Sequence, residues 1–156
     1  MRQGVVLLVF IVGCGNVVDD APSAGCPGQY VPLSGGQAEH GYLKGTSATT
    51  WYRADEACPA NLPRAYLAVP NDAAELMALR TLAGNTLWIG VHDRLNDGTF
   101  IEERPNQMVA PATFLPWAPG EPDGGTSQDC VAATATTIGT EVCDVAAQLF
   151  ICECEP

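Results

Sequence analysis

The spacing of apolar residues predicts two helices in the first half of the chain. The first helix is expected to begin at the capping residues Thr49-Thr50 and to end at Pro59. Its core-facing positions recur at helical intervals: Trp51, Ala54, Ala57 and Cys58. The second helix is expected to begin at the Asn71-Asp72 cap and to stop at Gly84-Asn85. Its core-facing positions are Leu76, Leu79, Leu82 and Ala83.

Short runs of apolar and β-favouring residues, bounded by turn residues, predict strands on either side of these helices. The expected strands cover residues 30–33, 41–44, 87–91, 99–102, 129–133 and 149–153. Ser34-Gly35-Gly36 separates the first two, and Asn96-Asp97-Gly98 is a strong turn signal between the next two. Residues 104–125 lack periodicity but carry bulky apolar side chains, which predicts a long ordered loop.

The first 25 residues predict processing and tethering rather than folded structure. Arg2 precedes an apolar stretch, residues 5–12, that is too short to span a bilayer but suits a signal-peptide core. The stretch ends at Gly13-Cys14, which resembles a bacterial lipoprotein box; an ordinary secretory signal is the alternative. We therefore expect a lipoprotein signal peptide at residues 1–13, acylation of Cys14 and a flexible tether over residues 14–25. The protein would then be exported and anchored to a bacterial cell envelope through this lipid alone.

Composition indicates one globular domain and argues against one class of partner. The chain has 156 residues, of which 47% are hydrophobic and 16% charged, as is usual for a single domain with a core. The 18 acidic against 7 basic residues give a formal net charge of −11. Nucleic acid is an unsuitable partner, because phosphate backbones are bound by clustered Lys and Arg.

The cysteines indicate an oxidising compartment. If Cys14 is acylated, an even number remains, enough for three disulfides whose pairing the count leaves open. These six are Cys26, Cys58, Cys130, Cys143, Cys152 and Cys154. A zinc cluster is disfavoured, because the chain has no Cys-x-x-Cys motif and its two histidines, His40 and His92, are far apart in sequence.

Four short motifs, in a fixed order after the first helix pattern, resemble the C-type lectin-like domain family. The motifs are Trp88-Ile89-Gly90, Gly120-Glu121-Pro122-Asp123, Asp129-Cys130-Val131 and Phe150-Ile151-Cys152-Glu153. The resemblance places the domain at residues 26–156. It implies an α+β fold of two helices with two small antiparallel sheets and a long loop. It also implies disulfides that staple this fold, namely Cys58–Cys152, Cys130–Cys143 and Cys26–Cys154.

The resemblance further implies a calcium and sugar site on the long loop. Glu121 and Asp123 flank Pro122, whose peptide bond is cis in the family, and Gln128 stands where the family has an acidic ligand. Ile138-Gly139-Thr140 stands where the family has Trp-Asn-Asp, so two oxygen ligands are missing or weakened. We expect any calcium to bind near the millimolar end of the range of protein sites.

Three more aspartates fall where some family members hold an accessory calcium: Asp93, Asp97 and Asp129. For Asp93 and Asp97 the alternative is ordinary turn chemistry, since Asp commonly tightens such turns. The aromatic residues Trp88, Phe100 and Trp117 are expected to pack in the core rather than to form a sugar-stacking platform.

Two functions follow, and neither is enzymatic, because the chain lacks a Ser-His-Asp arrangement, a phosphate-binding loop and an activated cysteine. The first is an exported, lipid-anchored, carbohydrate-binding module, weakly assisted by calcium through the Glu121-Pro122-Asp123 loop. The alternative is a calcium-independent module that binds a surface protein or has a structural role.

Overall fold

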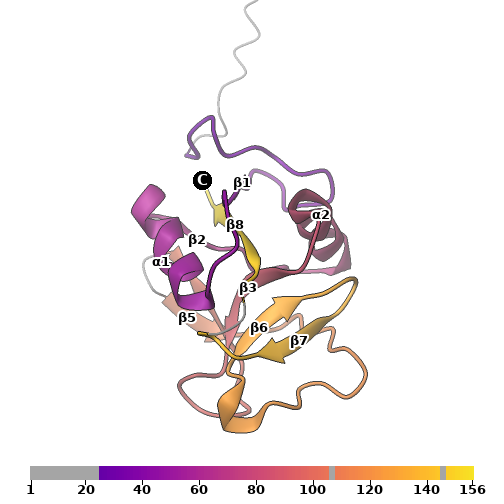
Figure 1. Ribbon diagram of the computed structural model, residues 1–156. Coiled ribbons are helices and arrows are strands. Elements are labelled where there is room, and N and C mark those ends of the chain that lie inside the picture. Colours follow the sequence, from indigo (N-terminus) through magenta and orange to yellow (C-terminus); the bar gives the residue numbers. More distant parts are fainter. Residues whose placement is uncertain (1–24, 106–107, 145–146) are drawn as a thin grey trace, which may run out of the picture.

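Two helices flank an arrangement of short strands in the computed structural model, which describes residues 25–105, 108–144 and 147–156 (Figure 1). The expected signal peptide (1–13) and Cys14 lie outside the described residues, as does the expected tether (14–25) except for Gly25. The two ends of the described chain meet, since a Cβ added to Gly25 would lie 2.5 Å from the Cα of Pro156.

Helix α1 (Trp51–Asn61) begins where the sequence predicts but ends later. The Thr50 side chain caps it by accepting a hydrogen bond from an N–H of the first turn. Its buried positions are Trp51, Ala54 and Cys58. The expectation that Pro59 ends the helix is wrong, because Pro59 lies inside it. Proline removes one N–H from the hydrogen-bond ladder, and this loss is confined here to the last turn.

Helix α2 (Ala73–Ala83) agrees with the prediction at both ends. The Asp72 side chain accepts a hydrogen bond from the Glu75 N–H at 2.9 Å. Gly84 has a φ of 75°, a left-handed conformation that glycine adopts without strain, and it closes the helix. In the part of the chain that the structure describes, no helix has the length and hydropathy needed to cross a bilayer.

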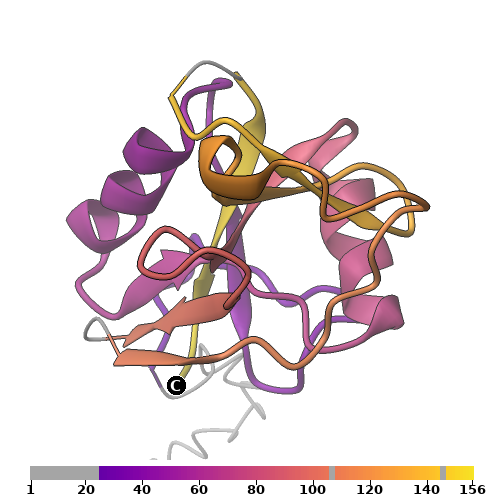
Figure 2. The same ribbon diagram turned by 90° about the horizontal axis from the view of Figure 1, so that it is seen from below.

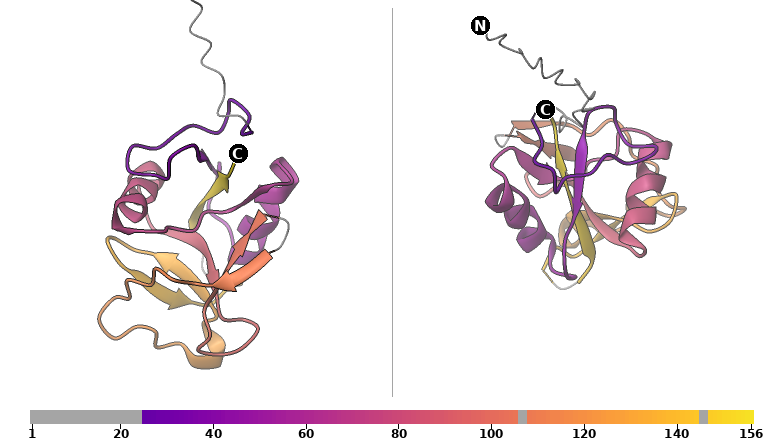
Figure 3. Two further views of the ribbon diagram at one scale, coloured as in Figure 1. Left: turned by 180° about the vertical axis from the view of Figure 1, so that it is seen from behind. Right: turned by 90° about the horizontal axis from the view of Figure 1, so that it is seen from above.

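The strands form two antiparallel groups joined by a short parallel pairing. In chain order they are β1 (Gly41–Lys44), β2 (Ala65–Leu67), β3 (Leu87–His92), β4 (Ile101–Arg104), β5 (Met108–Pro111), β6 (Cys130–Ala133), β7 (Ile138–Glu141) and β8 (Leu149–Cys154). In the first group β8 pairs with β1 and β2. In the second, β3 lies between β4 and β6, and β5 and β7 extend it. The groups meet where β3 runs parallel to the start of β8, and the two helices lie on opposite sides of β1 and β8 (Figure 3).

Three strands were not predicted, and one predicted strand is absent. Residues 30–33 contribute only an isolated bridge from Val31 to Tyr42. Strand β2 is three residues long, too short for a period of two to show in the sequence. Strand β5 lies in the proline-rich segment taken as loop, so the long loop starts after Pro111 rather than at Arg104. Strand β7 contains the three residues that stand in place of the family's missing ligands.

Three disulfides connect the described cysteines, in the pairs that the resemblance implies: Cys26–Cys154, Cys58–Cys152 and Cys130–Cys143. The second ties α1 to β8, and the third ties β6 to the segment after β7. One part of the core surrounds the buried Trp51 and the disulfides. The other lies under α2 and includes Leu79, Ile89 and Ile151. The α+β fold with two helices and disulfide staples is therefore as predicted.

Candidate functional site

The long loop, residues 112–129, lies at the end of the molecule remote from the described chain ends (Figures 1 and 2). Backbone hydrogen bonds fasten it to β7: Ala118 N–H donates to the Ile138 carbonyl at 2.9 Å, and Ile138 N–H donates to the Pro116 carbonyl at 3.0 Å. These bonds hold the loop immediately before the segment that carries Glu121 and Asp123.

The aromatic residues near the loop serve packing. Trp88 is fully buried, and its indole N–H donates to the Thr49 carbonyl at 2.8 Å. Phe100 and Trp117 meet edge to face, with ring centroids 4.7 Å apart, and pack against the part of the core under α2. Each ring thus has a role in the core, as the sequence predicts.

Glu121 is bound by strand β7. The Glu121-Pro122 peptide bond is cis, as the resemblance implies. Glu121 Oε2 accepts two hydrogen bonds from Thr140, one from its N–H at 2.9 Å and one from its hydroxyl at 2.8 Å. A Cβ added to Gly139 would lie 2.9 Å from Glu121 Oε1, so the absence of a side chain there allows this close approach. Strand β7, which stands where the family has two further ligands, therefore holds the side chain of Glu121, one of the predicted ligands.

Asp123 and Gln128 gather around the same threonine. The Asp123 N–H donates to Thr140 Oγ1 at 3.4 Å, and Gln128 Oε1 also lies 3.4 Å from that oxygen. The Gln128 side chain covers Gly124, where an added Cβ would lie 2.1 Å from the Gln128 Cβ. The structure therefore brings Glu121, Asp123 and Gln128 together around Thr140, with Asp123 exposed to solvent.

Two of the three predicted accessory ligands, Asp93 and Asp97, border a cavity of about 200 Å³ beside this cluster, which Gln128 also lines. Asp93 is 4% exposed; its Oδ2 accepts the Gly98 N–H at 2.8 Å, which is the turn chemistry offered as the alternative. Its buried Oδ1 has no hydrogen-bond partner among the described residues. Burial raises the pKa of Asp93, and the charges of Asp129 and Asp97 act in the same direction. A cation near Oδ1 would stabilise the charged form of Asp93 against both its burial and the repulsion from Asp129 and Asp97.

Asp129 takes a different place from the other two aspartates. Its backbone carbonyl accepts the Asp93 N–H at 3.0 Å, and its side chain does not line the cavity. The oxygen side chains in this region are the hard donors that calcium prefers, but one oxygen of Glu121 is already engaged by Thr140. The donor set therefore fits a weakly held calcium ion better than a tightly held one.

The two histidines lie apart, each beside a glutamate. His40 Nδ1 is 2.6 Å from Glu153 Oε1, and His92 Nε2 is 2.8 Å from Glu103 Oε1. His40 is partly exposed, whereas His92 is fully buried. They do not form a common site, in agreement with their separation in the sequence.

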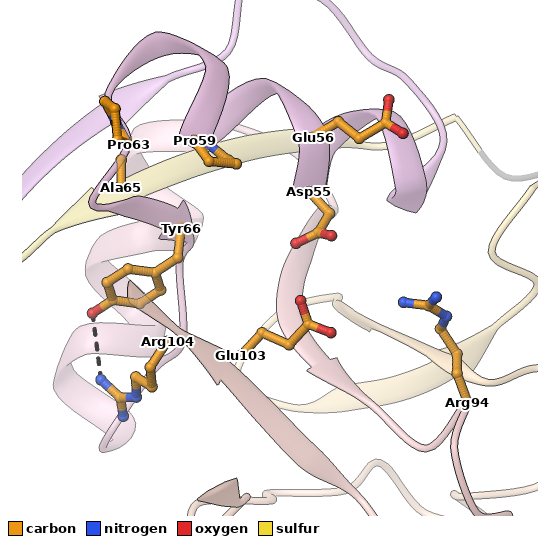
Figure 4. Close-up of a pocket in the computed structure, with 9 residues that line it drawn as sticks. All are labelled: Asp55, Glu56, Pro59, Pro63, Ala65, Tyr66, Arg94, Glu103 and Arg104. Carbon is orange, nitrogen blue, oxygen red and sulfur yellow. Dashed lines mark hydrogen bonds between the residues drawn. The ribbon is translucent and has the colours of Figure 1, made fainter. Parts of the chain in front are cut away.

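A cleft of about 610 Å³ between α1 and β4 was not predicted. Figure 4 shows the carboxylates of Asp55 and Glu103 facing one another across it, with Arg94 pointing toward them. The hydrogen bond to His92 lowers the pKa of Glu103. Burial, assisted by the charge of Glu103, raises the pKa of Asp55 to about 6. These residues come from a helix, a strand and a loop, so no sequence motif could have indicated the cleft.

Replacing Asp55 with asparagine is expected to stabilise the domain above about pH 7. The folded protein keeps a proton on Asp55 up to a pKa of about 6, against 3.8 for the free group, so the wild-type free energy of unfolding falls as the pH rises through this window. Asp55→Asn removes this loss. We expect a gain of about 1–2 kcal/mol above about pH 7 and no gain near about pH 3.5.

Urea unfolding at several pH values between these limits measures the effect of Asp55→Asn. The control is Glu39→Gln, a change at an exposed carboxylate that does not line the cleft and is expected to leave the pH profile unchanged. A constant difference between Asp55→Asn and wild type at every pH would contradict the assignment to Asp55 ionisation.

Comparison with known proteins agrees with this architecture. The sequence model of the family described as "Lectin C-type domain" matches residues 47–154. The chain belongs to the C-type lectin domain family. A tetranectin-like protein from Carcharhinus perezii is 31% identical to this C-type lectin domain over 120 residues, which cover 72% of this chain and 69% of that protein. Human C-type lectin domain family 3 member A is 28% identical over 121 residues, covering 72% of this chain and 58% of its own length.

Solved structures show the same C-type lectin fold. The C-type lectin CEL-I from Cucumaria echinata superposes with a TM-score of 0.67 at 24% identity, covering 82% of this chain and 96% of that one. A structure described as a calcium-independent type II antifreeze protein superposes with a TM-score of 0.68 at 20% identity, covering 82% of this chain and 92% of that one. At these identities the likeness establishes the fold and not the ligand.

Proposed function

We propose that this C-type lectin domain binds carbohydrate on the long loop, beside Glu121, Asp123 and Gln128. The gathering of these three residues around Thr140 carries the proposal. Carboxylate and amide oxygens accept hydrogen bonds from sugar hydroxyl groups, and the Gln128 amide can also donate one. The loop lies at a free end of the domain, where a glycan can approach it (Figure 1). The site is one of binding and not of catalysis.

We also propose that a weakly bound calcium ion assists carbohydrate binding at this site. Glu121 and Asp123 supply carboxylate oxygens, and the unpartnered Oδ1 of Asp93, with Asp97 and Asp129 nearby, supplies a place for an accessory ion. Calcium sites usually have six to eight oxygen ligands, and sites with fewer charged ligands bind more weakly. A dissociation constant of about 1 mM is therefore expected.

A glycan array probed with the full chain, in calcium and then in chelator, tests this function. Glu121→Gln and Asp123→Asn are each expected to weaken glycan binding about tenfold, because each removes a charged acceptor. The control Glu56→Gln changes an exposed carboxylate on α1, outside the loop, and should leave binding unchanged. Glycan binding that is unaffected by both loop variants would rule out this site.

The second candidate function is a calcium-independent module that binds a protein or has a structural role. The two hydrogen bonds from Thr140 favour it, because they satisfy Glu121 Oε2 without an ion. Among the neighbours in fold, one is described as a calcium-independent and another as a Ca²⁺-dependent type II antifreeze protein, so the architecture exists in both forms. Calorimetry that detects calcium binding below about 1 mM, together with affinity for a monosaccharide, would count against this candidate.

We also propose that the protein is exported and lipid-anchored through Cys14. The support is the apolar stretch that ends at Gly13-Cys14, together with the disulfide pairing of the other six of its seven cysteines. The two curated relatives described above are from a shark and from human, so a bacterial envelope as the location rests on this motif alone. In a bacterial host, Cys14→Ser should abolish labelling by radioactive palmitate and release the protein from the membrane fraction; retention of both would contradict the proposal.

A further inference from the structure

A cluster at the opposite end of the domain from the long loop combines an imidazole with two carboxylates. His40, Glu153 and Glu155 each offer one potential ligand atom, and these three atoms lie within 4.8 Å of one another. We propose that they form a binding site for a divalent transition-metal ion of the zinc class. This site is independent of the carbohydrate site and shares no residue with it.

The pairing of β1 with β8 explains why the three side chains meet. Tyr42 is opposite Glu153, and Gly41 is opposite Cys154. Continuing this register by one step places His40 opposite Glu155. Residues two apart on a strand point to the same face, so His40, Glu153 and Glu155 share one side of the strand pair. Glu153 lies within β8, and His40 and Glu155 lie one residue beyond the paired ends of β1 and β8, so the strand pair brings the three side chains together.

The ligand distances suit zinc after side-chain movements of about 1 Å, since the three atoms lie within 4.8 Å of one another and the widest pair has to close by no more than about 1.4 Å. His40 Nδ1 lies 2.6 Å from Glu153 Oε1, so these two atoms already point toward each other. Zinc bonds of about 2.0–2.2 Å in tetrahedral geometry separate neighbouring ligand atoms by about 3.4 Å, which requires this pair to open by less than about 1 Å. A water molecule would take the fourth position. Mixed nitrogen and oxygen donors favour zinc over calcium, which prefers oxygen ligands in larger number.

The charge of the surroundings also favours a cation. Glu153 is fully buried, and so is Glu75, whose charge acts on Glu153. A buried carboxylate is costly unless a positive charge compensates it. The cation Arg104 contacts Glu155, with Nη1 3.1 Å from Oε1, and so compensates the charge of Glu155 rather than that of Glu153. A divalent ion at the cluster would compensate Glu153 more fully than His40 can, and the 18% exposure of the His40 side chain gives the ion a route from solvent.

Hydrogen bonds from neighbouring residues fix the orientation of both glutamates. The Val69 N–H donates to Glu153 Oε2 at 3.1 Å, which leaves Oε1 facing His40. The Tyr66 hydroxyl donates to Glu155 Oε1 at 2.6 Å, the same oxygen that Arg104 contacts. Such outer partners are usual around metal ligands, where they hold the carboxylate in a binding orientation.

Calorimetry with zinc chloride on the oxidised full chain, first freed of metal with a chelator, tests the site. We expect one zinc ion per chain with a micromolar dissociation constant. His40→Ala and Glu155→Gln are each expected to weaken zinc binding about tenfold or more, since each removes a direct ligand. Glu39→Gln is the matched control, because Glu39 is the exposed neighbour of His40.

Two further measurements distinguish this site from the loop site and from a folding defect in a variant. Glu121→Gln should leave zinc binding unchanged, so failure of the loop proposal does not affect this test. Cobalt should produce visible absorption bands with the wild-type chain that are lost in Glu155→Gln, a check that holds even if His40→Ala folds poorly. The absence of saturable zinc binding below about 1 mM, or zinc binding that persists undiminished in both ligand variants, would overturn the proposal.

Discussion

Replacing Cys58 and Cys152 together with alanine is expected to lower the free energy of unfolding by about 3.5–4 kcal/mol. The disulfide joins residues 94 apart in sequence. With Cys26–Cys154 intact, the loop that it closes in the unfolded chain runs from Cys58 to Cys26 and from Cys154 to Cys152, about 34 residues, and its removal gives this loop more conformational freedom. Both sulfur atoms lie in the core, since Cys58 and Cys152 are 0% and 3% exposed. The bond ties α1 to β8, so its loss also loosens the helix that carries Trp51. The double variant should be largely unfolded at about 37 °C.

Urea unfolding followed by circular dichroism measures this loss. The matched control is Cys130→Ala with Cys143→Ala, which opens a sequence separation of 13 residues and should cost about 3 kcal/mol. The difference between the two double variants isolates the effect of loop length. A smaller loss for Cys58–Cys152 than for Cys130–Cys143 would contradict the argument from chain entropy.

Gly90→Ala is expected to destabilise the domain by about 3 kcal/mol or more. A Cβ at this position would lie 2.2 Å from the Leu67 carbonyl oxygen and 3.0 Å from Val69 Cγ2. The Gly90 N–H donates to the Ala68 carbonyl at 2.9 Å, so β3 and the segment after β2 are held close together. Strand β2 is also paired with β8, so moving it away from Gly90 would break these hydrogen bonds. Close-packed interiors transmit such a clash rather than absorb it.

Thermal and urea unfolding of Gly90→Ala measure this cost. Gly28→Ala is the control, because a Cβ at Gly28 would meet nothing within 4 Å, and the change should stay within about 0.5 kcal/mol. Similar stability of the two variants would show that the backbone around Gly90 can relax, which would contradict the close approach of β3 to the segment after β2.

Local sequence signals predicted the helices and strands whose ends are set by residues close by in the sequence. The cap at Asp72 and the left-handed stop at Gly84 lie where their side-chain chemistry places them. Strand β1 has the predicted bounds, because β-favouring residues and flanking turns mark it. By contrast, β5 and β7 are not marked by their own residues. They form because β4 and β6 offer them hydrogen-bonding edges, and this is a property of the assembled sheet.

The candidate site was predicted in part for the same reason. Glu121 and Asp123 are adjacent to Pro122 and form a recognisable motif. The role of Thr140 is not encoded in any motif, because it depends on the hydrogen bonds that fasten the loop to β7. The meeting of His40 with Glu153, 113 residues apart, likewise follows from the pairing of the first strand with the last.

The sequence by itself determined the family, the starts of both helices, the cysteines available for disulfides and the acidic loop motif, since each can be recognised from residue types and their order along the chain. The tertiary structure alone decided which carboxylates are free to bind a ligand. It engages one oxygen of Glu121 with Thr140, leaves Asp93 Oδ1 without a partner among the described residues, and buries Glu153 against His40. The physical reason is that a carboxylate's availability depends on the donors and charges that the fold brings within hydrogen-bond distance, and these come from distant parts of the chain.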